Sequence, residues 1–504
     1  MSDSLVWSIV LPIIGSVGVF AIQTRHTPLI GCLFSLGTAV IVASVTYRVW
    51  RDGPLTHELA GWGAPLGIDL YADGLSAFML ASNGLVGLLI SAAAFWYFQG
   101  GQPDKGDEVP NSQSFWPLWL FLWGSLNLAY LSSDAFNLYI AVELIGLAGV
   151  GLIVITGSTD SFIAAMRYLL VALLGSLSYL FGVALLYGEF HTLDIRLIAE
   201  HAGQVEGGLT MWAALALISV GLMVKTALFP LHFWLPPAHS SAAAPVSAIL
   251  SALVVKATFY LMLRLWFGVF SEQMTVPFGQ LFGVLGTCAI VGGSVQAILQ
   301  RRLKMMVAYS TVAHIGYLFL LVPLTIPFRN GNDATWDFVG YSGGMYHLLS
   351  HALAKSAMFL AAGIAIASMG SDRLRHLRGM AQQLPLTTFA FGLAGVCLMG
   401  LPPSGGFVAK WFMVNAALDS GQWWWAIVLL LGGLLTTVYV FLVLRYAFLA
   451  PQPPHFTAPS RPLEVITLLL ALLSLAIGLR AVEAFDLLEH GTPFLDATME
   501  GGDP

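Results

Sequence analysis

Long apolar segments recur almost without pause along this 504-residue chain, and they limit what it can fold into. Each is about twenty residues long, enough for a helix to cross the roughly 30 Å of hydrocarbon in a membrane. Hydropathy windows predict an all-α, polytopic membrane protein with about fourteen spans. The spans are placed near residues 4–22, 29–48, 74–98, 114–132, 135–157, 161–188, 209–229, 243–268, 277–299, 304–324, 340–369, 385–418, 423–448 and 463–481.

The composition supports this interpretation. Only 10% of the residues are charged and 57% are hydrophobic, whereas a soluble domain carries about 25% charged residues. Lipid must therefore be the main solvent of the fold. A net charge of -6 without any basic run argues against nucleic acid as a partner. Cys32, Cys288 and Cys397 are far apart in apolar stretches, so neither a metal site nor a cofactor is predicted.

The basic residues of the loops predict the orientation in the membrane. With fourteen spans, one side holds Arg25, Lys105, Arg301, Arg302, Lys304, Arg373, Arg375, Arg378, Arg445 and Arg461. The other side holds Arg48, Arg51, Arg196, Arg329 and Arg480. The richer side should be cytoplasmic, which places the chain in the inner membrane with both termini outside. A short interfacial helix is predicted within residues 191–207, and a loose acidic tail from Asp486.

Ionisable residues inside the predicted spans point to function. Each costs about 2.5–3.5 kcal/mol at the bilayer centre unless it is paired or wet, so a chain that keeps many of them is expected to use them. The spacing of four in the eleventh span places three of them on one helical face. The ionisable residues singled out within the spans are Glu143 in the fifth span, Lys225 in the seventh, Lys256 in the eighth, His314 in the tenth, His347, His351 and Lys355 in the eleventh, and Lys410 in the twelfth.

These side chains suit proton transfer. The pKa of an amine falls in a low-dielectric site and rises again beside a carboxylate, so moving a nearby charge can load or unload its proton. Histidine exchanges protons near neutral pH without much tuning. Simpler interpretations remain open: a lone histidine that only joins two helices, or a static ion pair between Glu143 and Lys225. Arg264 is expected to extend toward the membrane surface, and Lys304 to be a topology charge.

Two spans contain helix breakers. The seventh runs into Pro230, and the twelfth holds Pro402, Pro403 and Gly405. Backbone N–H and C=O groups that lose their helical hydrogen bonds inside a membrane must be buried in protein or face a wet cavity. Interrupted helices at matching positions of two halves indicate inverted repeats. Spans four to eight and nine to thirteen would then form two inverted five-helix units, each with a lysine beside its break.

Four stretches resemble the antiporter-like subunits of respiratory complex I and of multisubunit Mrp cation/proton antiporters. They are KTALFPLHFWLPPAHSSAAAPVSAILSALVVK, RRLKMMVAYSTVAHIGY, HLLSHALAKSAMFLAAG and GLPPSGGFVAKWF, and DLYADGLSAFML is similar to the start of the family's conserved region. The resemblance implies fourteen helices, inverted repeats and broken helices seven and twelve. It also implies that Glu143 pairs with Lys225, that Lys256 is the central lysine, and that Lys410 is the terminal residue. His314, His347 and His351 would extend the polar axis between them.

The subtype expected from the resemblance is the D subunit of an Mrp antiporter. Lys410 stands where one complex I subunit has glutamate, and the chain ends soon after Arg480, without the long lateral helix of the largest members. The predicted function is proton translocation coupled to Na+ or K+, with other membrane subunits as partners. The alternative is a proton-pumping subunit of a complex I-like oxidoreductase or membrane-bound hydrogenase. Glu143 is the only carboxylate placed within a span, so no cation site is identified.

The predicted organisation has four parts. Residues 1–113 form an N-terminal three-helix region, 114–268 the first repeat, and 269–450 the second repeat. Residues 451–504 hold the last span and the acidic tail.

Overall fold

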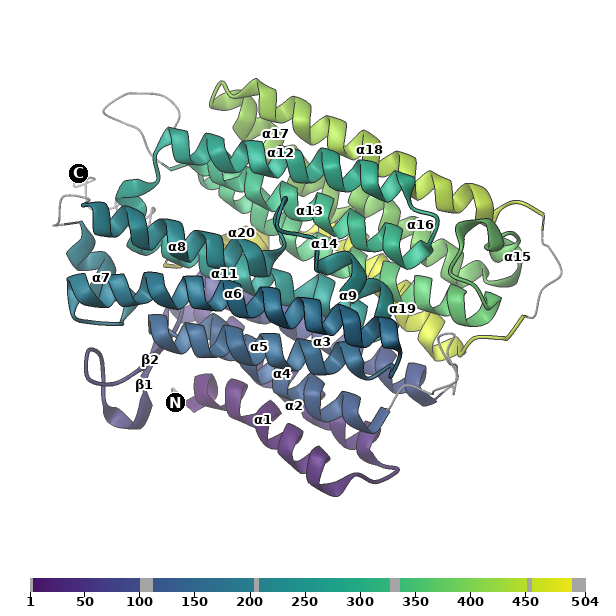
Figure 1. Cartoon of the computed structure of the whole chain (residues 1–504), viewed down its shortest axis with the longest axis horizontal. Helices are drawn as coiled ribbons and strands as arrows, with labels where there is room; N and C mark the ends of the chain where they lie inside the picture. Colours follow the sequence, from purple (N-terminus) through teal and green to yellow (C-terminus); the bar gives the residue numbers. More distant parts are fainter. Residues whose placement is uncertain (1–2, 100–111, 204–207, 327–335, 451–455, 492–504) are drawn as a thin grey trace.

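The structure is a computed structural model that describes residues 3–99, 112–203, 208–326, 336–450 and 456–491. It is a bundle of long helices with one small hairpin (Figure 1). The helices are α1 (Asp3–Ile22), α2 (Thr27–Asp52), α3 (Gly74–Gln99), α4 (Ser112–Leu131), α5 (Ala135–Val154), α6 (Thr159–Phe190), α7 (Ile195–Ala202), α8 (Leu209–Thr226), α9 (Leu235–Ser241), α10 (Ala244–Ile249), α11 (Val255–Arg264), α12 (Val276–Leu299), α13 (Leu303–Thr325), α14 (Phe338–Met369), α15 (Met380–Gln383), α16 (Pro385–Met399), α17 (Gly405–Asp419), α18 (Trp423–Ala447), α19 (Arg461–Ala476) and α20 (Val482–Glu489).

The predicted spans agree with the helices. Twelve helices of the described residues are long and apolar enough to cross a membrane, and each matches one predicted span. The predicted span at 114–132 coincides with α4, and the one at 385–418 consists of the two shorter helices α16 and α17. The polytopic all-α fold is therefore confirmed, while the total of fourteen spans stays a prediction.

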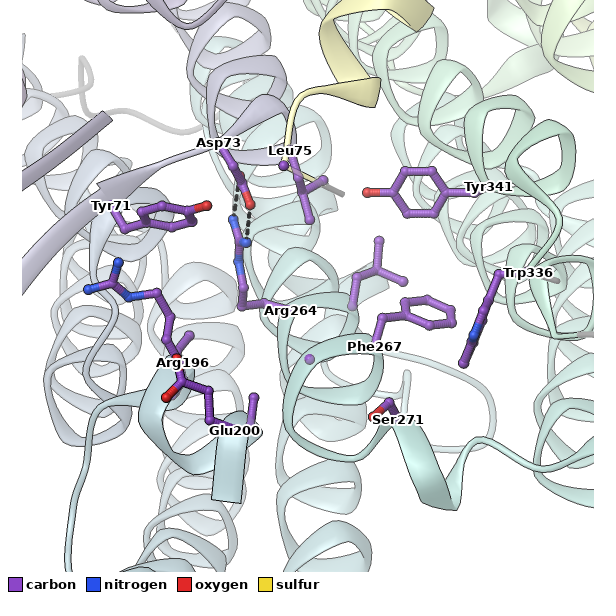
Figure 2. Close-up of a pocket in the computed structure, with 15 residues that line it drawn as sticks. Tyr71, Asp73, Leu75, Arg196, Glu200, Arg264, Phe267, Ser271, Trp336 and Tyr341 are labelled. Atoms are coloured by element: carbon purple, nitrogen blue, oxygen red, sulfur yellow. Dashed lines mark hydrogen bonds and ion pairs between the residues drawn. The ribbon is translucent and has the colours of Figure 1, made fainter. Parts of the chain in front are cut away.

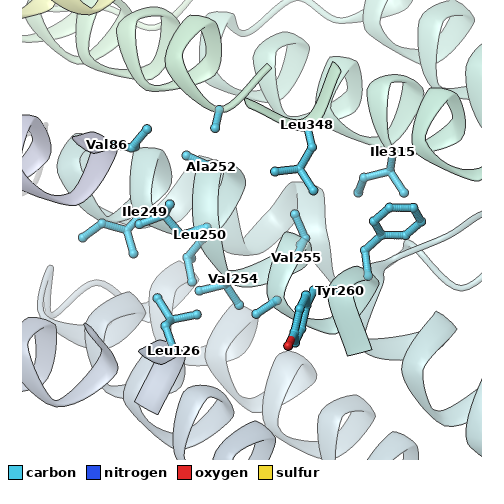
Figure 3. Packing of buried hydrophobic residues seen from close by; sticks show 14 of the residues in the cluster. Val86, Leu126, Ile249, Leu250, Ala252, Val254, Val255, Tyr260, Ile315 and Leu348 are labelled. Atoms are coloured by element: carbon cyan, nitrogen blue, oxygen red, sulfur yellow. The ribbon is translucent and has the colours of Figure 1, made fainter. Parts of the chain in front are cut away.

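Three helical stretches form the centre of the bundle. In their most apolar windows, 100% of residues are buried in the stretch 244–269, 89% in α13 and 94% in α14. The stretch 244–269 joins α10 to α11 through a π-helical segment, Leu250–Val254, and continues into a second one, Leu265–Val269. Side chains from this stretch interlock with neighbours from α3, α4, α13 and α14 (Figure 3). These central helices carry most of the ionisable residues singled out above.

The two ends of the bundle differ. At one end lie the N-terminal end of α1, the short helix α7 and the antiparallel pair β1 (Leu55–Glu58) and β2 (Asp69–Ala72), all on the left of Figure 1. We refer to this as the hairpin end. At the opposite end lies α15, beside the connections that hold Arg302 and Arg373. We refer to that as the α15 end.

The structure corrects two expectations. The hairpin was not foreseen, because strands of four residues between long apolar runs leave little pattern in the sequence. The tail is not loose from Asp486, because α20 continues to Glu489 and the backbone N–H of Gly74 donates to the carbonyl of His490 at 2.6 Å. The part of the predicted tail beyond Gly491 lies outside the described residues.

Glycines let long helices approach closely where no side chain would fit. A Cβ atom on Gly221 of α8 would lie 2.4 Å from the carbonyl oxygen of Gly175 on α6. A Cβ atom on Gly316 of α13 would likewise lie 2.4 Å from the carbonyl oxygen of Gly286 on α12. Small residues at such crossings give the backbone contact that holds membrane helices together, since lipid supplies no hydrophobic drive.

The order of helix contacts is similar in the two halves of the bundle. α4, α5, α6 and α8 each pack on the next, and so do α12, α13, α14 and the α16–α17 pair. The two predicted five-helix repeats require this order, and the inverted relation between them remains a prediction.

Replacing Gly221 with valine should loosen the contact between α6 and α8. Overpacking of this kind typically costs about 1–3 kcal/mol, so the melting temperature of the detergent-solubilised protein should fall. Gly18→Val on α1 is the matched control, because a Cβ atom there meets nothing within 4 Å. Equal melting temperatures for the two variants would contradict this packing.

Candidate functional site

Glu143 and Lys225 form a buried ion pair between α5 and α8. The Lys225 Nζ donates to Glu143 Oε1 at 2.9 Å, with the lysine side chain 5% exposed and the glutamate 25% exposed. A lone lysine at this depth would be strongly unfavourable, and the carboxylate offsets that cost. The structure thus brings these two residues together.

The helix that carries Lys225 ends one residue later. α8 stops at Thr226, and Ala227 takes the left-handed conformation with φ 60°. The carbonyl of Val224, in the last turn of α8, accepts a hydrogen bond from Trp234 Nε1 at 2.9 Å, and Pro230 lies in the turn that leads to α9. Because the C-terminal end of a helix carries partial negative charge, the break places favourable potential beside the ammonium group.

The second break lies between α16 and α17. Gly400 ends α16 with φ 83°, Pro402 and Pro403 follow, and the side chain of Ser404 caps the first turn of α17, which begins at Gly405. Lys410 of α17 reaches back across the break. Its Nζ donates to the carbonyls of Leu398 at 2.9 Å and Met399 at 3.0 Å. The amine therefore caps the carbonyl end of the preceding half-helix.

Lys256 lies at the centre of the bundle beside a π-helical segment. Its Nζ donates to the backbone carbonyl of Ser251, which belongs to that segment. π-Turns widen the backbone and recur at functional sites. The hydroxyl of Ser251 in turn contacts the hydroxyl of Thr311 on α13 at 3.0 Å.

Lys355 of α14 reaches the same turn of α13. Its Nζ donates to Val307 O at 2.5 Å and to Ser310 Oγ at 2.6 Å. Ser310 and Thr311 are adjacent, so this turn lies between the two amines. His314 follows one turn further along α13.

The three histidines form one cluster. His314 Nδ1 lies 3.3 Å from His347 Nε2, and its Nε2 lies 3.2 Å from the hydroxyl of Tyr439. The His351 ring is centred 5.1 Å from the His314 ring. Neither ring nitrogen of His351 has a hydrogen-bond partner among the described residues, and buried polar atoms of this kind usually bind water.

Tyr317 joins the histidine cluster to Lys410. The lysine Nζ lies 4.5 Å from the centre of the tyrosine ring, a cation–π contact. The same ring lies 5.2 Å from the His314 ring and 5.0 Å from the His347 ring. Sequence analysis missed Tyr317, although its position three residues after His314 places both on one helical face.

A row of polar groups therefore runs through the central helices from Lys256 to Lys410. It passes the Ser310–Thr311 turn, Lys355, the histidines and Tyr317. The Glu143–Lys225 pair lies beside this row, since Thr226, the residue after Lys225, donates to the hydroxyl of Thr258 on α11 at 2.9 Å. No side-chain hydrogen bond links Lys225 to Lys256 within the described residues, so a proton crossing that gap needs bridging water.

Three other charged residues differ from expectation. Arg264 does not extend to the membrane surface but forms a buried ion pair with Asp73. Lys304 is buried and donates to Ala242 O at 2.7 Å. Glu464 is a second buried carboxylate within a predicted span, bound by Thr387 Oγ1 at 2.7 Å. These residues stand near span ends, where the sequence does not distinguish buried charges from solvated ones.

No metal centre is found in the part of the chain that the structure describes. Among those residues, histidine, cysteine and acidic side chains do not form any group of three or more that could hold a metal ion.

The Tyr317–Lys410 contact can be measured by a double-mutant cycle. Tyr317→Phe keeps the aromatic face and Tyr317→Leu removes it, so the leucine variant should lose about 2 kcal/mol more stability, the size of a desolvated cation–π contact. In a Lys410→Met background the difference between the two variants should shrink. Thermal unfolding in detergent provides the measurement, and an unchanged difference would exclude the contact.

Comparison with known proteins gives three kinds of match. Residues 132–436 match the family described as NADH:quinone oxidoreductase/Mrp antiporter, TM. The chain is 33% identical over 440 residues to the N subunit of the NADH-quinone oxidoreductase of Desulforudis audaxviator, which covers 87% of this chain and 84% of that protein. It is 26% identical over 511 residues to the D subunit of the Na+/H+ antiporter of Bacillus subtilis, which covers 99% and 97%. A chain of the Mrp complex from Dietzia sp. superposes with a TM-score of 0.87 at 25% identity, covering 99% of both chains.

Proposed function

The chain belongs to the family of membrane subunits shared by NADH:quinone oxidoreductases and Mrp antiporters, and on that premise we propose that it is a proton-translocating subunit of a multisubunit Na+ or K+/proton antiporter. The observation that carries the proposal is the buried row of amines and histidines joined from helix to helix. The antiporter D subunit of Bacillus subtilis matches over nearly its full length, which supports the antiporter assignment.

The proposed route begins at Glu143 and Lys225 and leaves by Lys410. A proton arriving near Glu143 weakens its hold on Lys225, which then passes a proton through water toward Lys256. From there the Ser310–Thr311 turn and the histidines offer hydroxyl and imidazole groups at short spacing. Each transfer moves one proton and leaves the carrier ready for the next one. The two helix breaks would expose backbone groups beside Lys225 and Lys410 on this route. Their residues are Pro230 at the first break and Pro402, Pro403 and Gly405 at the second.

The proposed assembly is an inner-membrane complex. The α15 end holds most of the basic loop residues and would face the cytoplasm, with both termini on the outer side. Lipid would cover the apolar outer faces, such as Leu170, Leu174 and Phe181 on α6. Other membrane subunits would be the partners, and they would also hold the cation site. The five-helix units at 114–268 and 269–450 would form the two halves of the route.

A second candidate is a proton-pumping subunit of a complex I-like oxidoreductase or membrane-bound hydrogenase. The 33% identity to an NADH-quinone oxidoreductase subunit favours it. In that case electron transfer in partner subunits would drive the same proton route, and no cation would be exchanged.

The composition of the native complex decides between the two. We expect the tagged chain, purified from its own membranes in mild detergent, to bring down only other hydrophobic antiporter-type subunits. Mass spectrometry identifies them. If iron–sulfur or nickel–iron subunits co-purify in stoichiometric amounts, the antiporter proposal is wrong and the chain is a subunit of a redox-driven pump.

The route itself is tested by transport. Glu143→Ala and Lys225→Ala should each abolish cation-dependent proton movement in inverted vesicles while the protein stays in the membrane, because each removes a proton carrier at the start of the row. Glu189→Ala, at an exposed site on α6, is the control and should exchange normally. Full exchange by either test variant would refute the route as drawn.

A further inference from the structure

A cavity of about 460 Å³ opens at the hairpin end of the bundle (Figure 2). One wall is charged and holds Asp73, Arg264, Arg196 and Glu200. The opposite wall is aromatic, with Trp336 and Tyr341. The cavity lies within the size range of functional pockets, roughly 300–1,000 Å³, and its polar wall makes it hospitable to water.

An ion pair between Asp73 and Arg264 forms part of the charged wall of this cavity. Arg264 Nη2 donates to Asp73 Oδ1 at 2.7 Å, and Arg264 Nη1 donates to the other carboxylate oxygen. The Asp73 side chain is 1% exposed and that of Arg264 is 12% exposed. The pair joins the start of α3 to the end of α11. Breaking this ion pair would therefore let cavity water reach further between the two helices.

Hydrogen bonds continue from this pair into the bundle. Arg264 Nη2 also donates to the hydroxyl of Tyr260 at 2.9 Å and to Ser76 Oγ at 2.8 Å. The Tyr260 hydroxyl contacts Ser76 Oγ at 3.0 Å and donates to the carbonyl of Tyr130 at 2.8 Å. Polar atoms therefore extend inward from the cavity wall between α3, α4 and α11.

The same helix carries the central lysine. Lys256, Tyr260 and Arg264 follow one another at intervals of four residues on α11, which places them along one helical face. The eight residue steps from Lys256 to Arg264 rise by about 12 Å. One face of α11 thus leads from the middle of the bundle to the cavity.

We propose that this cavity is a water-filled mouth through which protons exchange between the solution at the hairpin end and Lys256, as a further opening of the route besides its ends at Glu143–Lys225 and Lys410. The inference rests on the proposed function, in which Lys256 carries protons. Tyr260 accepts one proton on its hydroxyl oxygen from cavity water and releases its own to water that leads to Lys256, so its charge is unchanged after each transfer. Arg264 keeps its proton throughout, and its pairing with Asp73 holds the route closed until a hydronium ion in the cavity gives its proton to the carboxylate and becomes water.

Water access is tested by thiol labelling in a variant without Cys32, Cys288 and Cys397. Gly268→Cys adds a thiol to the cavity wall, where a Cβ atom meets nothing within 4 Å. Gly188→Cys, exposed near the hairpin-end terminus of α6, is the positive control, and Gly392→Cys, inside α16, is the negative control. A membrane-impermeant sulfonated thiosulfonate should label the first two from the same side of sealed vesicles. Absence of label at Gly268→Cys would overturn the proposal.

Transport then tests the connection to Lys256. Labelled Gly268→Cys should lose proton movement, while labelled Gly188→Cys should keep it. Tyr260→Phe should slow transport about tenfold, the effect of losing one good hydrogen bond, whereas Tyr187→Phe, exposed on α6, should not. Full rates in labelled Gly268→Cys or in Tyr260→Phe would show that Asp73 and Arg264 only lock two helices. If the cysteine-free parent with its native tyrosines moves no protons, the proposed function fails instead, and the labelling result still decides whether the cavity holds water.

Discussion

Charge inside this bundle has to be held by protein, because hydrocarbon offers no hydrogen bonds and little screening. Four lysines on the proposed route meet this requirement in two ways. Lys225 has a carboxylate partner, Glu143. Lys256, Lys355 and Lys410 are held by backbone carbonyls, joined at Lys355 by one hydroxyl. The carbonyls for Lys256 and Lys410 come from places where the α-helix is irregular, a π-helical segment and a helix break. The irregular backbone and the buried amines therefore depend on each other.

This difference in partners has a consequence for proton movement. A carbonyl dipole stabilises an ammonium group but does not cancel its charge, so each carbonyl-held amine remains sensitive to charges on its neighbours. Lys410 illustrates the point, since its ammonium group also faces the ring of Tyr317, which in turn touches two histidines. On the proposed route, a change of charge at one group would therefore alter the proton affinity of its neighbours in the row. The static-lock interpretation fits the Glu143–Lys225 pair taken alone, but it gives no reason for three further amines without carboxylate partners.

The bundle is also asymmetric between its ends. The hairpin end gathers buried acidic residues, Asp69, Asp73 and Asp194, and holds Arg196 and Arg264 in ion pairs. The α15 end is rich in arginines on connecting loops. One of them, Arg302, forms a partly exposed ion pair with Asp372. The proposed route would open toward both sides of the membrane, and the two ends differ in their electrostatics. The relatives include both antiporter and oxidoreductase subunits, so the proposed route would suit either assembly, with the driving force supplied by partner subunits.

The sequence by itself determined the class of fold and the order of the helices, and it singled out the lysines and histidines that the structure places along the row. Twenty-residue apolar runs leave a helix bundle as the only way to satisfy the backbone, and Lys225, Lys256 and Lys410 stand out because charge is so rare around them. Pro230 and Pro402 marked the breaks through their own covalent geometry. Only the tertiary structure decided which carbonyls and hydroxyls hold Lys256, Lys355 and Lys410. Asp73 and Arg264 are far apart in the chain, and the sequence shows Tyr317 as one aromatic residue among many in apolar helices. Their contacts form only when the helices pack.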